Sequence, residues 1–134
     1  MKGTASGELV GGNISILYSL LGSTSSIDTK DKILFIEDLD EYLYHIDRMM
    51  YNLKRNGYFE HVKGIIVGSM TDMHDNEIPF GQNAIQIITA ITKEYNIPIA
   101  FDFPAGHQSD NRTLILGQQV DFEVNEKEIK LIFD

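Results

Sequence analysis

The chain has 134 residues, with 11 Lys and Arg against 20 Asp and Glu, so its formal net charge is −9. Its 43% hydrophobic and 23% charged residues are typical of one soluble domain, long enough to build a core without cross-links. The absence of cysteine excludes a disulfide framework, a cysteine zinc site and a cysteine nucleophile. The acidic charge disfavours nucleic acid and anionic lipid as partners, and no stretch approaches the ~20 apolar residues that span a bilayer.

Three segments carry the apolar spacing of helices. The first is a short helix over about 13–21, which residues 11–13, Gly-Gly-Asn, are expected to precede as a turn. The second covers about 42–55, and Asp40 is its expected N-cap because a carboxylate there accepts from free backbone N–H groups. The third covers about 81–94 and ends where a proline approaches.

Between these helices lie apolar runs that predict strands. The runs over 33–36, 65–67 and 97–101 do not alternate with polar residues, which is typical of strands covered on both faces. The segments 120–124 and 129–133 do alternate, which predicts an antiparallel hairpin. The order predicts an α/β domain with a mixed sheet, flanking helices and a C-terminal antiparallel hairpin.

Polar residues follow these strands at the edge where α/β sheets bind ligands. Glu37 and Asp38 end the first run, Ser69 follows the second, and His107 lies on a glycine-bearing loop after the third. A carboxylate and an imidazole are the pieces of a general base and its orienting acid. The same residues also fit a plainer interpretation, in which the acids are solvated or cap helices and His107 is a surface residue.

No serine lies in the tight Gly-x-Ser-x-Gly turn that presents a nucleophile, and no phosphate-binding glycine loop occurs. The oxygen-rich stretch 71–77 lacks the central glycine of a calcium loop, and the histidines lack metal-ligand spacing. The residues therefore indicate an acid and a base without a nucleophile. No metal and no cofactor are expected.

Four segments of the chain carry a more specific signal, namely 3–13, 34–38, 46–49 and 104–107. In order and spacing they resemble the C-terminal half of the LD-carboxypeptidase family. This family comprises the muramoyltetrapeptide carboxypeptidases and the microcin C self-immunity peptidases. The resemblance covers essentially the whole chain, and four ordered motifs are a more specific signal than any one of them.

The resemblance implies a serine peptidase with a Ser-Glu-His triad, of which Glu37 is the acid and His107 the base. It makes Glu41, the alternative acid, a candidate for contacting the substrate or supporting the triad, together with Asp38 and Gly106. The triad serine of the family lies in an N-terminal domain. We therefore expect residues 1–134 to be the C-terminal domain alone, without the nucleophile domain, and to be inactive by themselves.

The substrate that the resemblance implies is a muropeptide tetrapeptide, from which the family removes the terminal D-amino acid at an LD linkage during peptidoglycan recycling. It also implies a bacterial cytoplasmic location, a homodimer and a small swivelling β/β/α domain. The partners are then the N-terminal domain and the substrate, without nucleic acid or membrane. Two alternatives stay open: a microcin C-type immunity peptidase fragment, and a non-catalytic module that binds peptide or protein. In the non-catalytic module, Glu37 and His107 need not contact each other.

Overall fold

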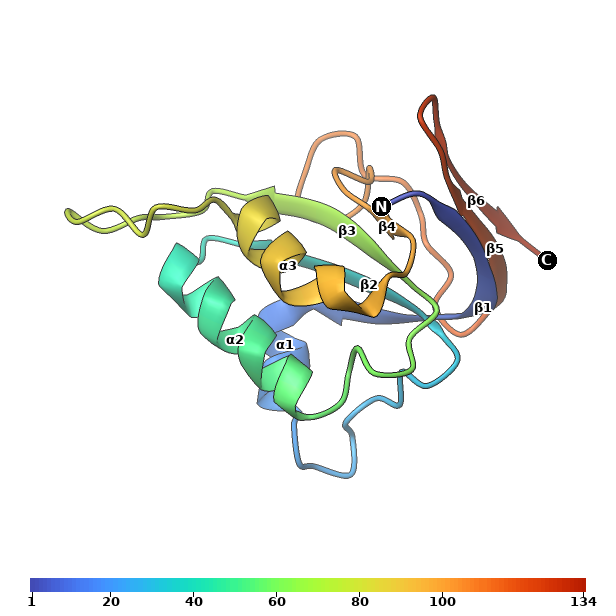
Figure 1. Ribbon diagram of the computed structural model, residues 1–134, viewed down its shortest axis with the longest axis horizontal. Helices are drawn as coiled ribbons and strands as arrows, with labels where there is room; N and C mark the ends of the chain where they lie inside the picture. The colour runs from blue at the N-terminus through green and yellow to red at the C-terminus, as the bar shows by residue number, and fades with distance from the viewer.

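The computed structural model describes residues 1–134 and shows one six-stranded sheet with three α-helices (Figure 1). The predicted α/β domain with a mixed sheet and a C-terminal hairpin is confirmed. None of the helices has the length and apolar character needed to cross a membrane. In chain order the elements are β1 (Gly3–Asn13), α1 (Ile14–Ser19), β2 (Ile33–Leu39), α2 (Leu43–Arg55), β3 (Gly64–Thr71), α3 (Ala84–Thr92), the 3₁₀ turn η1 (Lys93–Tyr95), β4 (Ile99–Ala100), β5 (Gln119–Val124) and β6 (Ile129–Phe133).

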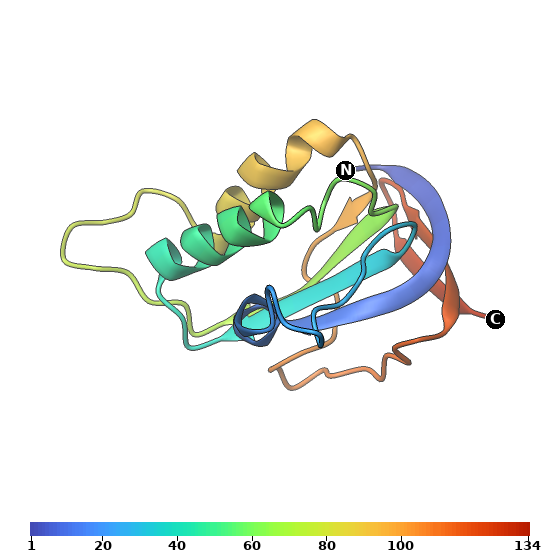
Figure 2. The ribbon, with the colours of Figure 1, turned by 90° about the horizontal axis from the view of Figure 1, so that it is seen from below.

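The strand order across the sheet is β4-β3-β2-β1-β5-β6. Strands β1 to β4 run parallel, whereas β5 is antiparallel to β1 and β6 is antiparallel to β5. The long strand β1 therefore belongs to both parts, because residues 9–13 pair with β2 and residues 3–8 pair with β5. It curves strongly along its length, and β5 and β6 close around one end of the sheet (Figure 2).

The sheet separates two apolar cores, because successive side chains of a strand point to opposite faces. Helices α1, α2 and α3 cover one face, where Leu34 and Ile36 of β2 are fully buried. On the other face, Ile33 and Phe35 of the same strand pack against β5 and the chain that follows β4. The prediction of central strands covered on both faces is confirmed.

The prediction of a turn over residues 11–13 is wrong, because these residues are the last part of strand β1. Gly11 permits this pairing, since a Cβ atom there would lie 1.9 Å from the carbonyl oxygen of Phe35 on β2. The short helix itself is confirmed. Asn13 ends the strand and caps α1, accepting a hydrogen bond from the backbone N–H of Ile16 at 3.1 Å.

The prediction that Asp40 caps the second helix is also wrong. The N-cap of α2 is Tyr42, which makes no side-chain capping bond. Asp40 has a left-handed backbone with φ of 59°, and its carboxylate binds Nε2 of His74 instead. The third helix is shorter than predicted, because Asn83 forms a capping box with Gln86 and α3 starts after it.

Candidate functional site

The carboxyl ends of the four parallel strands meet at one edge of the sheet. Glu37 and Asp38 are neighbours near the end of β2, so their side chains point to opposite faces. Glu37 faces the loop that follows β4, whereas Asp38 faces α1. The two acids that the sequence placed together therefore belong to different polar clusters.

Glu37 and His107 meet, as the family resemblance implies. Nδ1 of His107 donates to Oε2 of Glu37 at 2.7 Å, across 70 positions of sequence. Glu37 is buried, with 5% of its surface exposed, whereas 52% of the His107 side chain is exposed. With Nδ1 held by the carboxylate, Nε2 makes no hydrogen bond to the protein and can accept a proton from a group outside this chain.

The loop that carries His107 is fixed to β3 and to itself by backbone contacts. The backbone N–H of Ser69 donates to the carbonyl oxygen of Ala105 at 3.0 Å. The backbone N–H of Gly106 donates to Oδ1 of Asn111 at 3.1 Å. These bonds set the course of the chain just before His107, so the imidazole projects from an ordered turn.

Gly106 lies directly against the pair. Its φ of 110° is unfavourable for other residues, and a Cβ atom there would lie 2.6 Å from Oγ of Ser69 and 3.0 Å from Oε2 of Glu37. The structure thus brings Gly106 to the candidate triad, where its lack of a side chain lets the loop approach the carboxylate. Ser69 is 8% exposed and its hydroxyl binds no protein group, so it is not presented as a nucleophile.

Asp38 is the most completely bonded acid of this edge and is only 2% exposed. Its carboxylate accepts from Nδ2 of Asn13 at 2.8 Å and from the backbone N–H of Leu39 at 2.9 Å. It also accepts from the backbone N–H and the hydroxyl of Ser15, at 3.0 and 2.9 Å. Asp38 therefore holds the start of α1 against β2 from inside the protein.

Glu41 lies in the cluster of Asp38 and does not contact His107. Its Oε1 lies 3.1 Å from the hydroxyl oxygen of Ser15, whose single proton is shared with Asp38, and its Oε2 accepts from Nδ1 of His45 at 2.6 Å. The contacts of Ser15 and His45 were not predicted from the sequence. The four-residue spacing of Glu41 and His45 across the start of α2 was the available signal for the second of these contacts.

The acidic residues do not gather into a metal-binding group, since no three His, Asp or Glu side chains converge. In the oxygen-rich stretch 71–77, Oδ1 of Asp75 accepts from the backbone N–H groups of Asn76 and Phe80, at 2.8 and 2.9 Å. These bonds shape the long loop that extends from the end of β3 to α3 (Figure 2).

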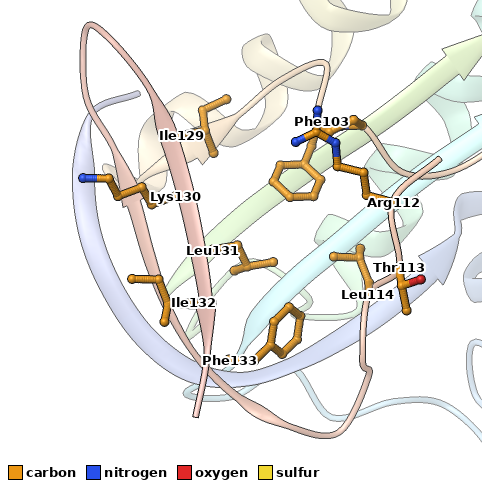
Figure 3. Close-up of a pocket in the computed structure, with 10 residues that line it drawn as sticks. Phe103, Arg112, Thr113, Leu114, Ile129, Lys130, Leu131, Ile132 and Phe133 are labelled. Atoms are coloured by element: carbon orange, nitrogen blue, oxygen red, sulfur yellow. The ribbon is translucent and has the colours of Figure 1, made fainter. Parts of the chain in front are cut away.

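An apolar pocket of about 390 Å³ lies where the two ends of the His107 loop meet β6. Phe103 and Leu114 come from the loop, and Leu131 and Phe133 come from β6 (Figure 3). All four pack against the second core. The loop is thus anchored by apolar side chains on both sides of the exposed turn that carries His107.

A buried carboxylate that orients an imidazole at the edge of an α/β sheet is the arrangement of the acid and base in hydrolytic triads. Residues 6–122 match the family model described as the LD-carboxypeptidase C-terminal domain. The match covers most of the chain, and the chain belongs to this family of carboxypeptidases. The resemblance found in the four sequence segments is confirmed.

Sequence similarity to individual carboxypeptidases supports the same family. The chain is 39% identical over 131 residues to a probable murein peptide carboxypeptidase of Bacillus subtilis, covering 95% of this chain and 40% of the relative. It is 28% identical over 131 residues to the murein tetrapeptide carboxypeptidase of Pseudomonas aeruginosa, covering 92% of this chain and 40% of the relative. The chain therefore spans about 40% of the length of these relatives.

Solved structures agree with the fold. The muramoyltetrapeptide carboxypeptidase from Oxalobacter formigenes superposes with a TM-score of 0.87 at 25% identity, over 99% of this chain and 47% of that chain. The microcin C7 self-immunity protein MccF, in complex with glutamyl sulfamoyl guanosine, also has a TM-score of 0.87 at 26% identity, over 100% of this chain and 39% of that one. The mixed sheet with its closing strands is the fold of this family.

Proposed function

We propose that this chain supplies the acid and the base of a serine-type LD-carboxypeptidase. The enzyme would remove the terminal D-amino acid from LD-linked muropeptide tetrapeptides. The observation that carries the proposal is the 2.7 Å contact between Nδ1 of His107 and Oε2 of Glu37 at the carboxyl edge of the sheet. The names of the murein carboxypeptidase relatives support the substrate class.

The proposed chemistry is acyl transfer to a serine on a separate N-terminal domain. Nε2 of His107 takes the serine proton while the serine oxygen attacks the carbonyl carbon of the LD peptide bond. His107 then gives that proton to the leaving amine as the C–N bond breaks. Water then attacks the ester carbon while the same nitrogen takes its proton, and this proton returns to the serine oxygen as the ester C–O bond breaks and the shortened peptide leaves. Glu37 holds the ring in the required tautomer and stabilises the imidazolium through both steps.

The N-terminal domain is part of the proposal, and its support is that the chain spans about 40% of its relatives. We place the reaction in the bacterial cytoplasm, in peptidoglycan recycling, and propose a homodimer as in the family resemblance. The likeness to the self-immunity protein MccF, 27% identical over 133 residues, favours a peptide-nucleotide antibiotic as the second candidate substrate.

The test is release of D-alanine from an LD-tetrapeptide by a protein in which this chain follows a serine-bearing N-terminal domain. The chain alone should show no turnover, because a base without a nucleophile has nothing to deprotonate. The joined protein should be active, and His107→Ala should lower its turnover by roughly a thousandfold or more. His61→Ala is the matched control, since this imidazole forms no side-chain hydrogen bond.

Three results would contradict the proposal. Turnover by the chain alone would reveal a nucleophile within it. Activity that survives His107→Ala would remove His107 as the base. Cleavage of an aminoacyl sulfamoyl nucleoside, without cleavage of the tetrapeptide, would favour the second substrate class.

A further inference from the structure

We propose that Thr71 is the positioning residue of His107. This inference rests on the proposed function, and it adds a residue that neither the sequence motifs nor the triad includes. Thr71 is the last residue of β3, and its Oγ1 donates to the backbone carbonyl oxygen of His107 at 2.7 Å. The contact joins the end of a central strand to the loop that carries the base.

Thr71 is itself held by the sheet. It pairs with Leu39 in the β2–β3 ladder, and its carbonyl oxygen accepts from the backbone N–H of Asp40 at 3.0 Å. Strand β2 also carries Glu37, two positions before Leu39. The acid and the residue that holds the backbone of His107 thus lie on neighbouring paired strands, with Glu37 at the irregularity between the Ile36–Val67 and Asp38–Met70 pairs.

The hydroxyl of Thr71 makes the only hydrogen bond to the main chain of His107. The bonds of Ser69 and Asn111 act two residues and one residue earlier, on Ala105 and Gly106. A further bond, from the backbone N–H of Gln108 to the carbonyl oxygen of Gly106 at 3.0 Å, closes the turn around His107 without using the main-chain groups of His107. Within this turn, His107 itself is held at two points, its ring by Glu37 and its carbonyl oxygen by Thr71.

Both points matter for the proposed chemistry. The ring must keep Nδ1 on the buried carboxylate while Nε2 faces a serine on another domain, and about 1 Å of misplacement can lower a rate by roughly a hundredfold. The side chain of His107 is half exposed to solvent, so few neighbouring side chains pack against it. Loss of the Thr71 bond should therefore loosen the imidazole without unfolding the domain.

The first measurement uses the chain itself, labelled with ¹⁵N. It records how fast the Nδ1-bound proton of His107 exchanges with water, and the other imidazoles, of His45, His61 and His74, serve as internal references. Thr71→Val keeps the shape but removes the donor, and it should speed this exchange by about tenfold, in proportion to the time the ring spends away from Glu37. Thr71→Ser keeps the hydroxyl and should restore slow exchange.

The second measurement uses the joined, active protein. Thr71→Val should lower kcat by roughly tenfold or more and leave KM unchanged, because the change acts on the position of the base. Thr71→Ser should recover kcat. Thr113→Val is the control, since it makes the same change at an exposed threonine without a side-chain hydrogen bond.

The outcomes separate this inference from the proposed function. If Thr71→Val leaves both the His107 proton exchange and kcat at wild-type values, Thr71 does not position the base. If Thr71→Ser behaves like Thr71→Val, the hydroxyl is not the cause and the inference is overturned. If the joined wild-type protein cleaves no tetrapeptide, the proposed function fails, and proton exchange in the chain still decides whether Thr71 holds His107.

Discussion

Two glutamate–histidine pairs lie at the same edge of the sheet with almost the same geometry. Nδ1 of His107 is 2.7 Å from Oε2 of Glu37, and Nδ1 of His45 is 2.6 Å from Oε2 of Glu41. The first pair spans 70 positions of sequence and joins β2 to a loop, whereas the second spans four positions at the start of α2. The Glu41–His45 pair needs only a helix start with a four-residue spacing, whereas the Glu37–His107 pair forms only when the whole domain is folded.

The surroundings of the two pairs differ more than their distances. The side chain of Glu37 is 7% exposed beside a His107 side chain that is 52% exposed, so the acid is enclosed and the base is presented. Glu41 is 21% and His45 33% exposed, and the second oxygen of Glu41 binds Ser15. The two pairs therefore share a short Glu–His distance but differ in exposure, and of the two only Glu37 and His107 combine an enclosed acid with an exposed imidazole.

Matched glutamine substitutions should separate the pairs most clearly. In the joined, active protein, Glu37→Gln keeps the size of the acid but loses its charge and favours the wrong imidazole tautomer, so turnover should fall by roughly 10⁴-fold. Glu41→Gln should lower turnover by less than about tenfold, because Glu41 does not reach His107. D-alanine release measures both. Equal losses of turnover in the two variants would mean that Glu41 takes part in the reaction as Glu37 does.

Asp38 belongs to the cluster of the second pair, and its removal should give the largest loss of stability. Asp38→Ala leaves the partly buried donors of Asn13, Ser15 and Leu39 without this acceptor, which should lower the free energy of unfolding by about 3 kcal/mol. Asp38→Asn keeps part of the acceptor capacity and should cost less. Urea denaturation measures both. A loss below about 1 kcal/mol for the alanine variant would show that water replaces these bonds.

Gly106 tests how closely the first pair is packed. Gly106→Ala adds a Cβ atom that collides with Ser69 and Glu37 at a positive φ, and should cost about 2 to 3 kcal/mol. Gly81→Ala is the control, because Gly81 also has a positive φ, of 85°, but nothing lies within 4 Å of its added atom. It should cost about 1 kcal/mol from the backbone alone. Similar unfolding free energies for both variants would mean that the loop moves aside.

The exposed charge pair of Lys54 and Glu94, far from the site, should give the smallest change in stability. The hydrogen bond between Lys54 and Glu94 lowers the pKa of Glu94 from its ordinary 4.5 and raises the pKa of Lys54 from 10.5. The stabilising effect of Glu94 is therefore present above about pH 4.5 and lost as the pH falls through its lowered pKa. Since the pair is exposed, Glu94→Gln should lower Tm by no more than about 2 °C at pH 7 and not at pH 2. A larger shift, or one that persists at pH 2, would show a contribution other than charge.

The sequence predicted the central part of the fold because β2, β3, α2 and α3 have strong apolar patterns. It predicted the edge that carries Glu37 and His107, since carboxyl ends of parallel strands meet there. It missed β1, whose residues 3–8 include Gly, Thr, Ala, Ser and Glu and no β-branched apolar side chain. That strand is specified by two partners rather than by its own propensity.

The remaining errors concern polar residues, for which several partners compete. Asp40 looked like a helix cap, but His74 supplies a cationic or donor partner from a distant loop. Ser15 and Thr71 look like ordinary surface hydroxyls in the sequence, and only the folded chain brings Asp38 and His107 to them. The family resemblance paired Glu37 with His107. Pattern alone placed them on one edge without deciding whether they touch.

The double pairing of β1 also sets an order of events during folding. Ser6 lies opposite Asp121, 115 positions later, so one side of the first strand stays open until nearly the whole chain has left the ribosome. Such distant pairing slows folding, and an unpaired strand edge is a template for association with other chains. Chains that stop before β5 should therefore accumulate as aggregates rather than as a smaller soluble domain.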